Sequence, residues 1–149
     1  MSHICEAVLI TCMDFRLHQR KDGRNYIADY IQMMGIDCDL VTRAGGILDL
    51  LNPAKNSFAD SILRDANVSH QLHSAHTLLF INHEDCGAYG QFKFKTRHEE
   101  IRKHETDLRW TLKTLHLLFP EKRIIGSFAE LENGTTDVFN IHKVFQYMP

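Results

Sequence analysis

Short apolar runs rich in β-branched residues alternate with longer stretches of helical periodicity, and this alternation restricts the fold of the chain more than any other feature. Such runs are typical of strands that are buried on both faces of a parallel sheet. Strands are expected at residues 7–11, 38–42, 77–81 and 123–128. Because ligands bind outside the carboxyl ends of the strands in sheets of this kind, the residues after each run are the first candidates for a site.

The segments between these runs have the periodicity of helices that cover a sheet. Helices are expected at residues 25–34, from 52 to about 72, and at 96–119. Asn133 and Gly134 indicate a tight turn into a short edge segment near Val138. Strands that alternate with helices of this length form βαβ units with right-handed crossovers. The sequence therefore predicts the α/β fold class, with a central, mostly parallel sheet of about four to five strands flanked by helices.

Length and charge limit the kind of partner. The 149 residues fall within the size of one domain, so we expect a single domain over residues 1–149. The 17 Lys and Arg against 19 Asp and Glu give a formal charge of −2, which provides no general attraction to nucleic acid or to an anionic membrane. The N-terminal apolar run is too short to span a bilayer and follows no basic region, which favours a cytoplasmic protein. A small-molecule partner is expected.

The cysteines suggest metal chemistry. Four cysteines are too few and too scattered for a disulfide framework, and a reducing cytosol keeps them as thiols. Cys12 directly follows the first predicted strand, and His83 and Cys86 follow the third with a spacing suited to metal ligands. Thiolate and imidazole ligands suit zinc, and catalytic zinc sites have three protein ligands with a fourth position left free. Cys12, His83 and Cys86 are therefore candidate ligands of one Zn²⁺ ion, although buried structural thiols remain the alternative for the two cysteines.

Asp14 and Arg16 lie close to the first of these ligands in sequence. Their alternating charges allow a bidentate ion pair that holds a carboxylate beside the metal.

A cysteine phosphatase is excluded, because it needs an arginine six positions after its nucleophile, where this chain has His18. A zinc deaminase is also excluded, because the sequence contains no Cys-x-x-Cys pair.

Three motifs occur in one order along the chain. They read Cys12-Met-Asp14-Phe-Arg16, then Arg43-Ala-Gly-Gly46, then His83-Glu-Asp-Cys86-Gly87. In this order and spacing, each just after a predicted strand, they resemble the signature of the β-class carbonic anhydrases. The resemblance extends from about Ala7 to Gly87.

This resemblance implies a function and a role for each site residue. It implies reversible hydration of carbon dioxide to bicarbonate by a zinc-bound hydroxide, with the zinc on the three ligands already named. Asp14 and Arg16 are implied as the catalytic pair, in which Arg16 orients Asp14. In some members the aspartate instead takes the fourth zinc position. Gly45 and Gly46 are expected to let the backbone approach the substrate closely.

Two other functions stay open. One is a related zinc hydrolase of a small linear substrate, carbonyl sulfide or carbon disulfide, and the other is a non-catalytic zinc-binding family member. The family also implies a homodimer or higher homo-oligomer. Only 11 residues precede Cys12, so we expect the N-terminal helical arm that many members wrap around a partner to be missing or vestigial. Phe15 is bulkier than the small residue often found at its position.

The remaining polar side chains are assigned to ordinary positions. We expect Glu84 and Asp85 to point to solvent and Cys5 and Cys38 to serve in packing. Surface or half-buried positions are expected for most of the remaining histidines, including His98, His104, His116 and His142.

Overall fold

A computed structural model describes residues 3–149. Its five-stranded sheet has the order β2-β1-β3-β4-β5. The strands are β1 (Ala7–Cys12), β2 (Cys38–Arg43), β3 (Thr77–His83), β4 (Arg123–Leu131) and β5 (Phe139–Tyr147). The first four pair in parallel and β5 is antiparallel to β4, which confirms the predicted α/β fold with a mostly parallel sheet.

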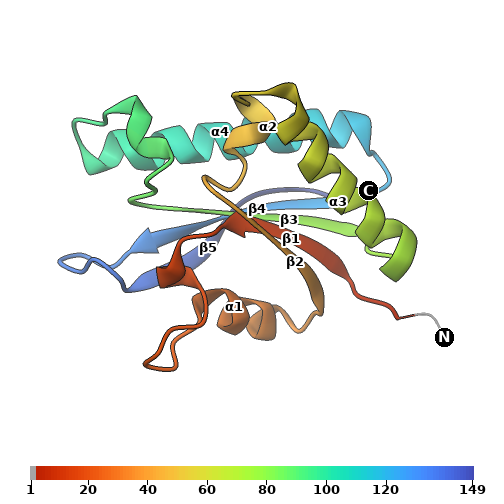
Figure 1. Ribbon diagram of the computed structural model, residues 1–149, viewed down its shortest axis with the longest axis horizontal. Helices are drawn as coiled ribbons and strands as arrows, with labels where there is room; N and C mark the ends of the chain where they lie inside the picture. Colours follow the sequence, from red (N-terminus) through yellow and green to blue (C-terminus); the bar gives the residue numbers. More distant parts are fainter. Residues whose placement is uncertain (1–2) are drawn as a thin grey trace.

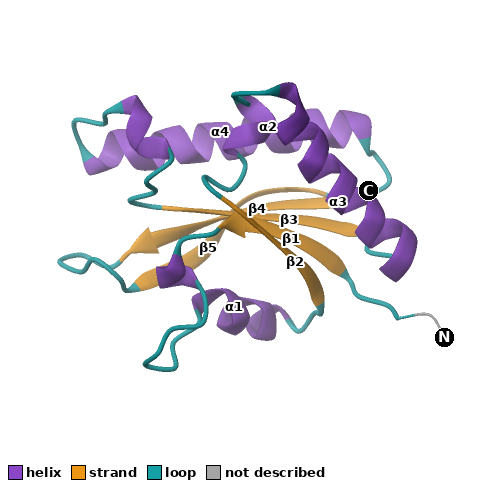
Figure 2. Cartoon of the chain, in the orientation of Figure 1, coloured by secondary structure: helices purple, strands orange, loops and turns teal. Residues whose placement is uncertain are grey.

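Helices cover both faces of this sheet (Figures 1 and 2). They are α1 (Tyr26–Met34), α2 (Leu48–Leu51), α3 (Asn56–His73) and α4 (Arg97–Leu118), with two short 3-10 turns, Phe15–Leu17 and Tyr89–Phe92. In Figure 1, α1 lies below the sheet, and α2, α3 and α4 lie above it. None of the helices in residues 3–149 is long and apolar enough to cross a membrane.

The two layers bury two hydrophobic clusters, one on each face of the sheet. Side chains alternate along β1, so Leu9 packs in the cluster on the α1 face, whereas Val8 and Ile10 pack in the cluster on the α3 and α4 face. Burial of β1 is complete along its length, as expected for a central parallel strand.

Helix boundaries follow local sequence signals. The Asn25 side chain accepts a hydrogen bond from the backbone N–H of Ala28 at 2.9 Å and so caps α1. Gly35 ends α1 in the left-handed conformation at φ 67°. Thr96 caps α4 by accepting from the N–H of Glu99 at 3.1 Å.

The C-terminal edge of the sheet differs from expectation. Instead of a short segment near Val138, β5 is a nine-residue strand. Its apolar residues are interspersed with polar ones, which is typical of an antiparallel edge strand with one solvated face. A register shift between Gly126 and Ser127 leaves Val144 as an extra residue on β5.

Candidate metal centre

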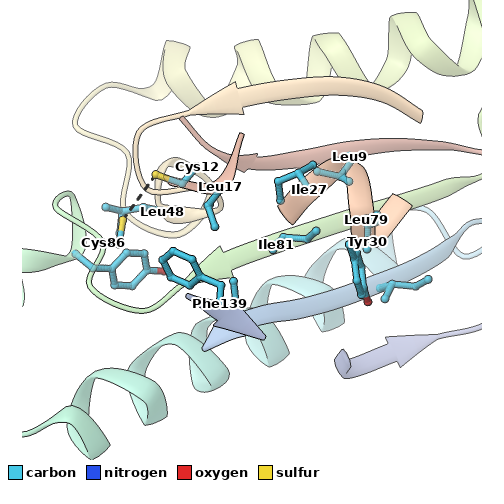
Figure 3. Close-up of a cluster of buried hydrophobic side chains, with 13 residues drawn as sticks. Leu9, Cys12, Leu17, Ile27, Tyr30, Leu48, Leu79, Ile81, Cys86 and Phe139 are labelled. Atoms are coloured by element: carbon cyan, nitrogen blue, oxygen red, sulfur yellow. Dashed lines mark hydrogen bonds between the residues drawn. The ribbon is translucent and has the colours of Figure 1, made fainter. Parts of the chain in front are cut away.

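Cys12, His83 and Cys86 come together at the carboxyl edge of the sheet. Cys12 ends β1, His83 ends the neighbouring parallel strand β3, and Cys86 lies in the turn that follows. The two sulfur atoms are 3.9 Å apart, and the three donor atoms all lie within 4.8 Å of one another. All three residues are buried. Figure 3 shows both cysteines in the hydrophobic cluster near Leu48 and Phe139.

The two ring nitrogens of His83 have different surroundings. Its Nδ1 lies 2.8 Å from the carbonyl oxygen of Glu84, which can only accept, so Nδ1 carries the proton. Nε2 therefore presents a lone pair, yet it is buried and has no hydrogen-bond partner among residues 3–149. A buried nitrogen is costly to leave unpaired, and a backbone carbonyl on the other nitrogen is the usual support of a metal-binding histidine. The three donors thus fit a zinc ion.

The two thiols influence each other's protonation. The hydrogen bond from Cys86 is the main cause that lowers the pKa of Cys12 far below the usual value for a thiol; burial opposes this effect and His83 adds to it. The same interaction, together with burial, raises the pKa of Cys86. The pair therefore favours one thiolate at neutral pH, which is the form that a metal ion binds.

Asp14 lies beside the three donors, with its Oδ2 atom 3.9 Å from Nε2 of His83. Arg16 donates to both carboxylate oxygens, from Nε to Oδ1 at 3.0 Å and from Nη2 to Oδ2 at 2.7 Å, and its backbone N–H also donates to Oδ1 at 2.9 Å. Burial raises the pKa of Asp14, but the hydrogen bonds from Arg16 outweigh it, so the net pKa is lowered. Asp14 is thus an oriented, ionised acceptor.

The remaining donors of Arg16 are fixed by two other loops. Nη1 donates to Asp85 Oδ2 and to the carbonyl of Thr136, both at 2.9 Å, and Nη2 donates to the carbonyl of Asp85 at 3.0 Å. The next residue, Asp137, accepts from Arg20 and Arg24, each at 2.9 Å. The turn before β5 therefore holds the loop that carries Asp14.

Phe15 points away from this arrangement, because 69% of its surface is exposed. Its ring lies under the guanidinium of Arg20 at 5.5 Å from the ring centroid. The bulk of Phe15 therefore projects to solvent.

Gly45 and Gly46 form a buried turn next to the cysteines, and both have positive φ, 80° and 59°. The N–H of Gly45 is among the groups that lower the pKa of Cys12. A Cβ on Gly46 would lie 2.5 Å from Oδ1 of the buried Asn82. The structure thus gives these glycines a packing role, and their role in a substrate cleft stays a prediction.

Gly46→Ala is expected to destabilise the protein more than Gly134→Ala. Both positions have positive φ, which costs an alanine about 1–2 kcal/mol. At Gly46 the added Cβ would also overlap Asn82, whereas no other part of the described chain lies within 4 Å of a Cβ on Gly134. The overlap with Asn82 should add about 1–3 kcal/mol to the loss. Urea unfolding of both variants measures this difference, and equal losses would contradict the packing role of Gly46.

Sequence reasoning missed a buried polar network behind the cysteines. Asn82 donates to the Tyr89 hydroxyl at 3.1 Å and lies 3.0 Å from Nδ1 of His104, while Tyr89 donates to Asp107 at 3.0 Å. The surface or half-buried position expected for His104 is wrong, because the residue is fully buried. Its spacing from the buried Leu108 on α4 is one helical turn, and this spacing is the signal that could have found it.

The solvent-facing position expected for Glu84 is also wrong. The side chain is buried and forms an ion pair with Arg97 through Nε, with a further bond from Nη2 at 3.1 Å. The N–H of Leu131 also donates to it, at 2.8 Å. Asp85 is exposed, as expected. Glu84 therefore links the turn between His83 and Cys86 to α4 and β4.

Glu84→Gln should lower the free energy of unfolding by about 1–3 kcal/mol, because it replaces charge-assisted hydrogen bonds in a buried position. Glu130→Gln is the matched control: Glu130 also pairs with Arg97, at 3.5 Å, but its side chain is 40% exposed. That change should cost no more than about 1 kcal/mol. Chemical denaturation of both variants measures the two losses in the free energy of unfolding. A larger loss for Glu130→Gln than for Glu84→Gln would contradict the prediction.

Fold and site together define a class: an α/β protein with two thiols and an imidazole gathered at the carboxyl edge of a parallel sheet. A family described as "Putative carbonic anhydrase" matches residues 2–139, and the chain belongs to this family. The resemblance of the three sequence motifs to carbonic anhydrases is thereby confirmed.

Individual relatives are distant. An uncharacterized protein of Rickettsia bellii is 24% identical over 141 residues, which cover 91% of this chain and 82% of the relative. An uncharacterized protein of Rickettsia conorii is 24% identical over 140 residues, covering 90% and 72%. Among solved structures, a carbonic anhydrase from Streptococcus mutans matches with a TM-score of 0.55 at 18% identity, over 97% of this chain and 84% of the other. This last likeness confirms the fold.

Proposed function

We propose that this chain binds one zinc ion through Cys12, His83 and Cys86 and catalyses the reversible hydration of carbon dioxide to bicarbonate. The observation that carries the proposal is the buried, unpaired Nε2 of His83 beside two thiols. Membership in the carbonic anhydrase family supports the same reaction.

The donor set suits a catalytic zinc site. Two sulfurs and one nitrogen leave one of four zinc positions for water or substrate. Zinc bound in this way lowers the pKa of a water molecule to about 7, which supplies a nucleophile at neutral pH. Two sulfurs 3.9 Å apart stay available to a metal only as thiols, so the proposal includes a reducing, cytoplasmic setting.

Asp14 and Arg16 supply the part of the reaction that belongs to the chain itself. Oδ2 of Asp14 accepts a hydrogen bond from Arg16 and has a second lone pair. The hydrogen bonds from Arg16 fix the direction of that lone pair. This atom accepts a hydrogen bond from the attacking water and orients it toward carbon dioxide. Arg16 keeps the carboxylate ionised and prevents its rotation.

The same pair argues against a purely structural zinc site. Structural sites use four protein ligands and need no oriented carboxylate next to a free position. Here Asp14 lies close to the donors while both of its oxygens are bound by Arg16, which favours an enzyme. Assembly into a homodimer or higher oligomer, and the single domain over residues 1–149, stay predictions.

One preparation tests both parts of the proposal. Elemental analysis should find zinc at the centre, and a stopped-flow pH-indicator assay on the same sample should show hydration faster than in the zinc-free protein. Zinc without hydration would contradict the proposed substrate and lead to assays with carbonyl sulfide and carbon disulfide. A protein that binds no zinc at these residues would contradict the proposal as a whole.

A further inference from the structure

A second group of metal-ligating side chains lies at the opposite edge of the sheet, where β1 begins and α3 ends (Figure 1). It consists of Cys5, just before β1, Asp39 on β2, and His73, the last residue of α3. Their donor atoms lie within 4.8 Å of one another. Seven positions along β1 separate Cys5 from Cys12, a distance of roughly 23 Å in a strand, so this group is separate from the metal centre.

Hydrogen bonds hold Cys5, Asp39 and His73 in place. The backbone N–H of Cys5 donates to the carbonyl of His73 at 3.1 Å, which fixes the segment before β1 against the end of α3. Oδ2 of Asp39 accepts from Nδ1 of His73 and from the hydroxyl of Ser69, both at 2.7 Å. The donors are therefore organised before any ion binds, and Ser69 orients the carboxylate from outside the group.

The group is also open to solvent and negatively charged. The side chains of Asp39 and His73 are each 35% exposed, whereas only 8% of Cys5 is exposed. Asp65 lines the same surface hollow as Asp39, Ser69 and His73 but pairs with Arg64 at 3.3 Å, so the negative charge of the group comes from Asp39. A cation can thus reach the mouth of the group and is attracted to it.

We propose that Cys5, Asp39 and His73 bind a second divalent transition-metal ion of the zinc class. One sulfur, one nitrogen and one carboxylate oxygen suit such an ion, and a fourth position stays free for water. The ion takes the place of the hydrogen between Nδ1 of His73 and Asp39. The imidazole stays neutral with its proton on Nε2, and Cys5 releases its thiol proton to solvent. Bound metal then ties the segment before β1 to β2 and α3.

Cys38 provides a matched control, because it adjoins Asp39 on β2. Side chains alternate along a strand, and Cys38 packs toward the cluster on the α1 face, away from the proposed ligands. Cys38→Ala therefore removes a neighbouring thiol without touching the proposed site.

The test is a Co²⁺ titration of the untagged, full-length protein after treatment with a chelator. Bound cobalt is counted by elemental analysis, and thiolate ligation is followed by its near-ultraviolet charge-transfer absorption. Cys5→Ala and His73→Gln should each bind one ion fewer than the parent protein, whereas Cys38→Ala should bind as many. Cys5→Ala should also lose part of the charge-transfer absorption. The proposal is wrong if Cys5→Ala and His73→Gln bind as many ions as the parent.

Two further variants separate loss of the second site from misfolding and from loss of the metal centre. Ser69→Ala leaves all three ligands in place and should weaken binding at this site about 10–100-fold, which tests the proposal even where a ligand variant folds poorly. Cys86→Ser should lose the ion at the sheet's other edge and keep this one. Failure of the proposed zinc centre and failure of the second site are thereby separate outcomes.

Discussion

Cys86→Ser is expected to remove the zinc ion from the metal centre. The change replaces one of two thiolates by a hydroxyl, which is a poor zinc ligand, and leaves the buried Nε2 of His83 facing a weaker donor set. The loss of affinity should exceed the roughly 10–100-fold that follows when an outer partner of a metal ligand is removed. Elemental analysis and competition with a chromophoric chelator measure the loss, and hydration of carbon dioxide should disappear with the metal.

Cys38→Ser is the control for this variant. Cys38 is also a free thiol and is half-buried, but it does not belong to the group of donors around His83. It should keep the zinc and the activity of the parent protein. If Cys86→Ser retained zinc as tightly as Cys38→Ser, the ligand assignment would be incorrect.

Asp14→Asn should leave zinc bound and lower turnover by about 10²-fold or more, within the range that a positioned proton acceptor contributes. The amide is nearly isosteric, but it loses the negative charge that Arg16 holds on both oxygens. The acceptor that orients the attacking water is thereby weakened, while the three donor atoms remain. Steady-state hydration rates and zinc content, measured on one preparation, test the two halves of this expectation.

Asp22→Asn is the matched control for Asp14→Asn, because the chain repeats the same spacing there. Asp22 accepts from the backbone N–H of Arg24 at 3.1 Å and from its Nε at 2.9 Å, in the manner of Asp14 and Arg16. This second pair is more exposed than Asp14 and Arg16 and belongs to the loop before α1. Its loss should leave turnover near the parent value, and a parental rate for Asp14→Asn would refute the role of the pair.

Most of the sheet could be predicted from the sequence because its central strands are buried on both faces. A run such as residues 77–81 has no alternative to a buried strand between two turns, and the structure places β3 there. The strand β5 was harder to predict because it is half solvated. Residues near Phe139 and Tyr147 alternate with polar ones, and only the pairing with β4 extends them over nine residues.

The grouping of Cys12, His83 and Cys86 could be predicted because their positions depend on strand ends alone. Parallel pairing of β1 with β3 brings Cys12 to His83 whatever the loops do. The partners of Glu84 and His104 depend on how α4 rests on the sheet, which the local sequence does not encode. Glu84 has the local pattern of a loop acid, and its partner Arg97 lies 13 residues later in the chain. The association of Cys5 with Asp39 and His73 likewise joins segments far apart in the sequence.

The turn before β5, which accepts a hydrogen bond from Arg16, is made late during synthesis. Chains leave the ribosome from the N-terminus and fold as their partners become available. The three proposed zinc ligands are all present once residues up to Cys86 have emerged, whereas Thr136 and Asp137, which hold the loop of Arg16, follow about fifty positions later. On the proposed function, a nascent chain thus has its metal ligands before the carboxylate of Asp14 is oriented, and formation of the β4–β5 hairpin is the step that completes the site.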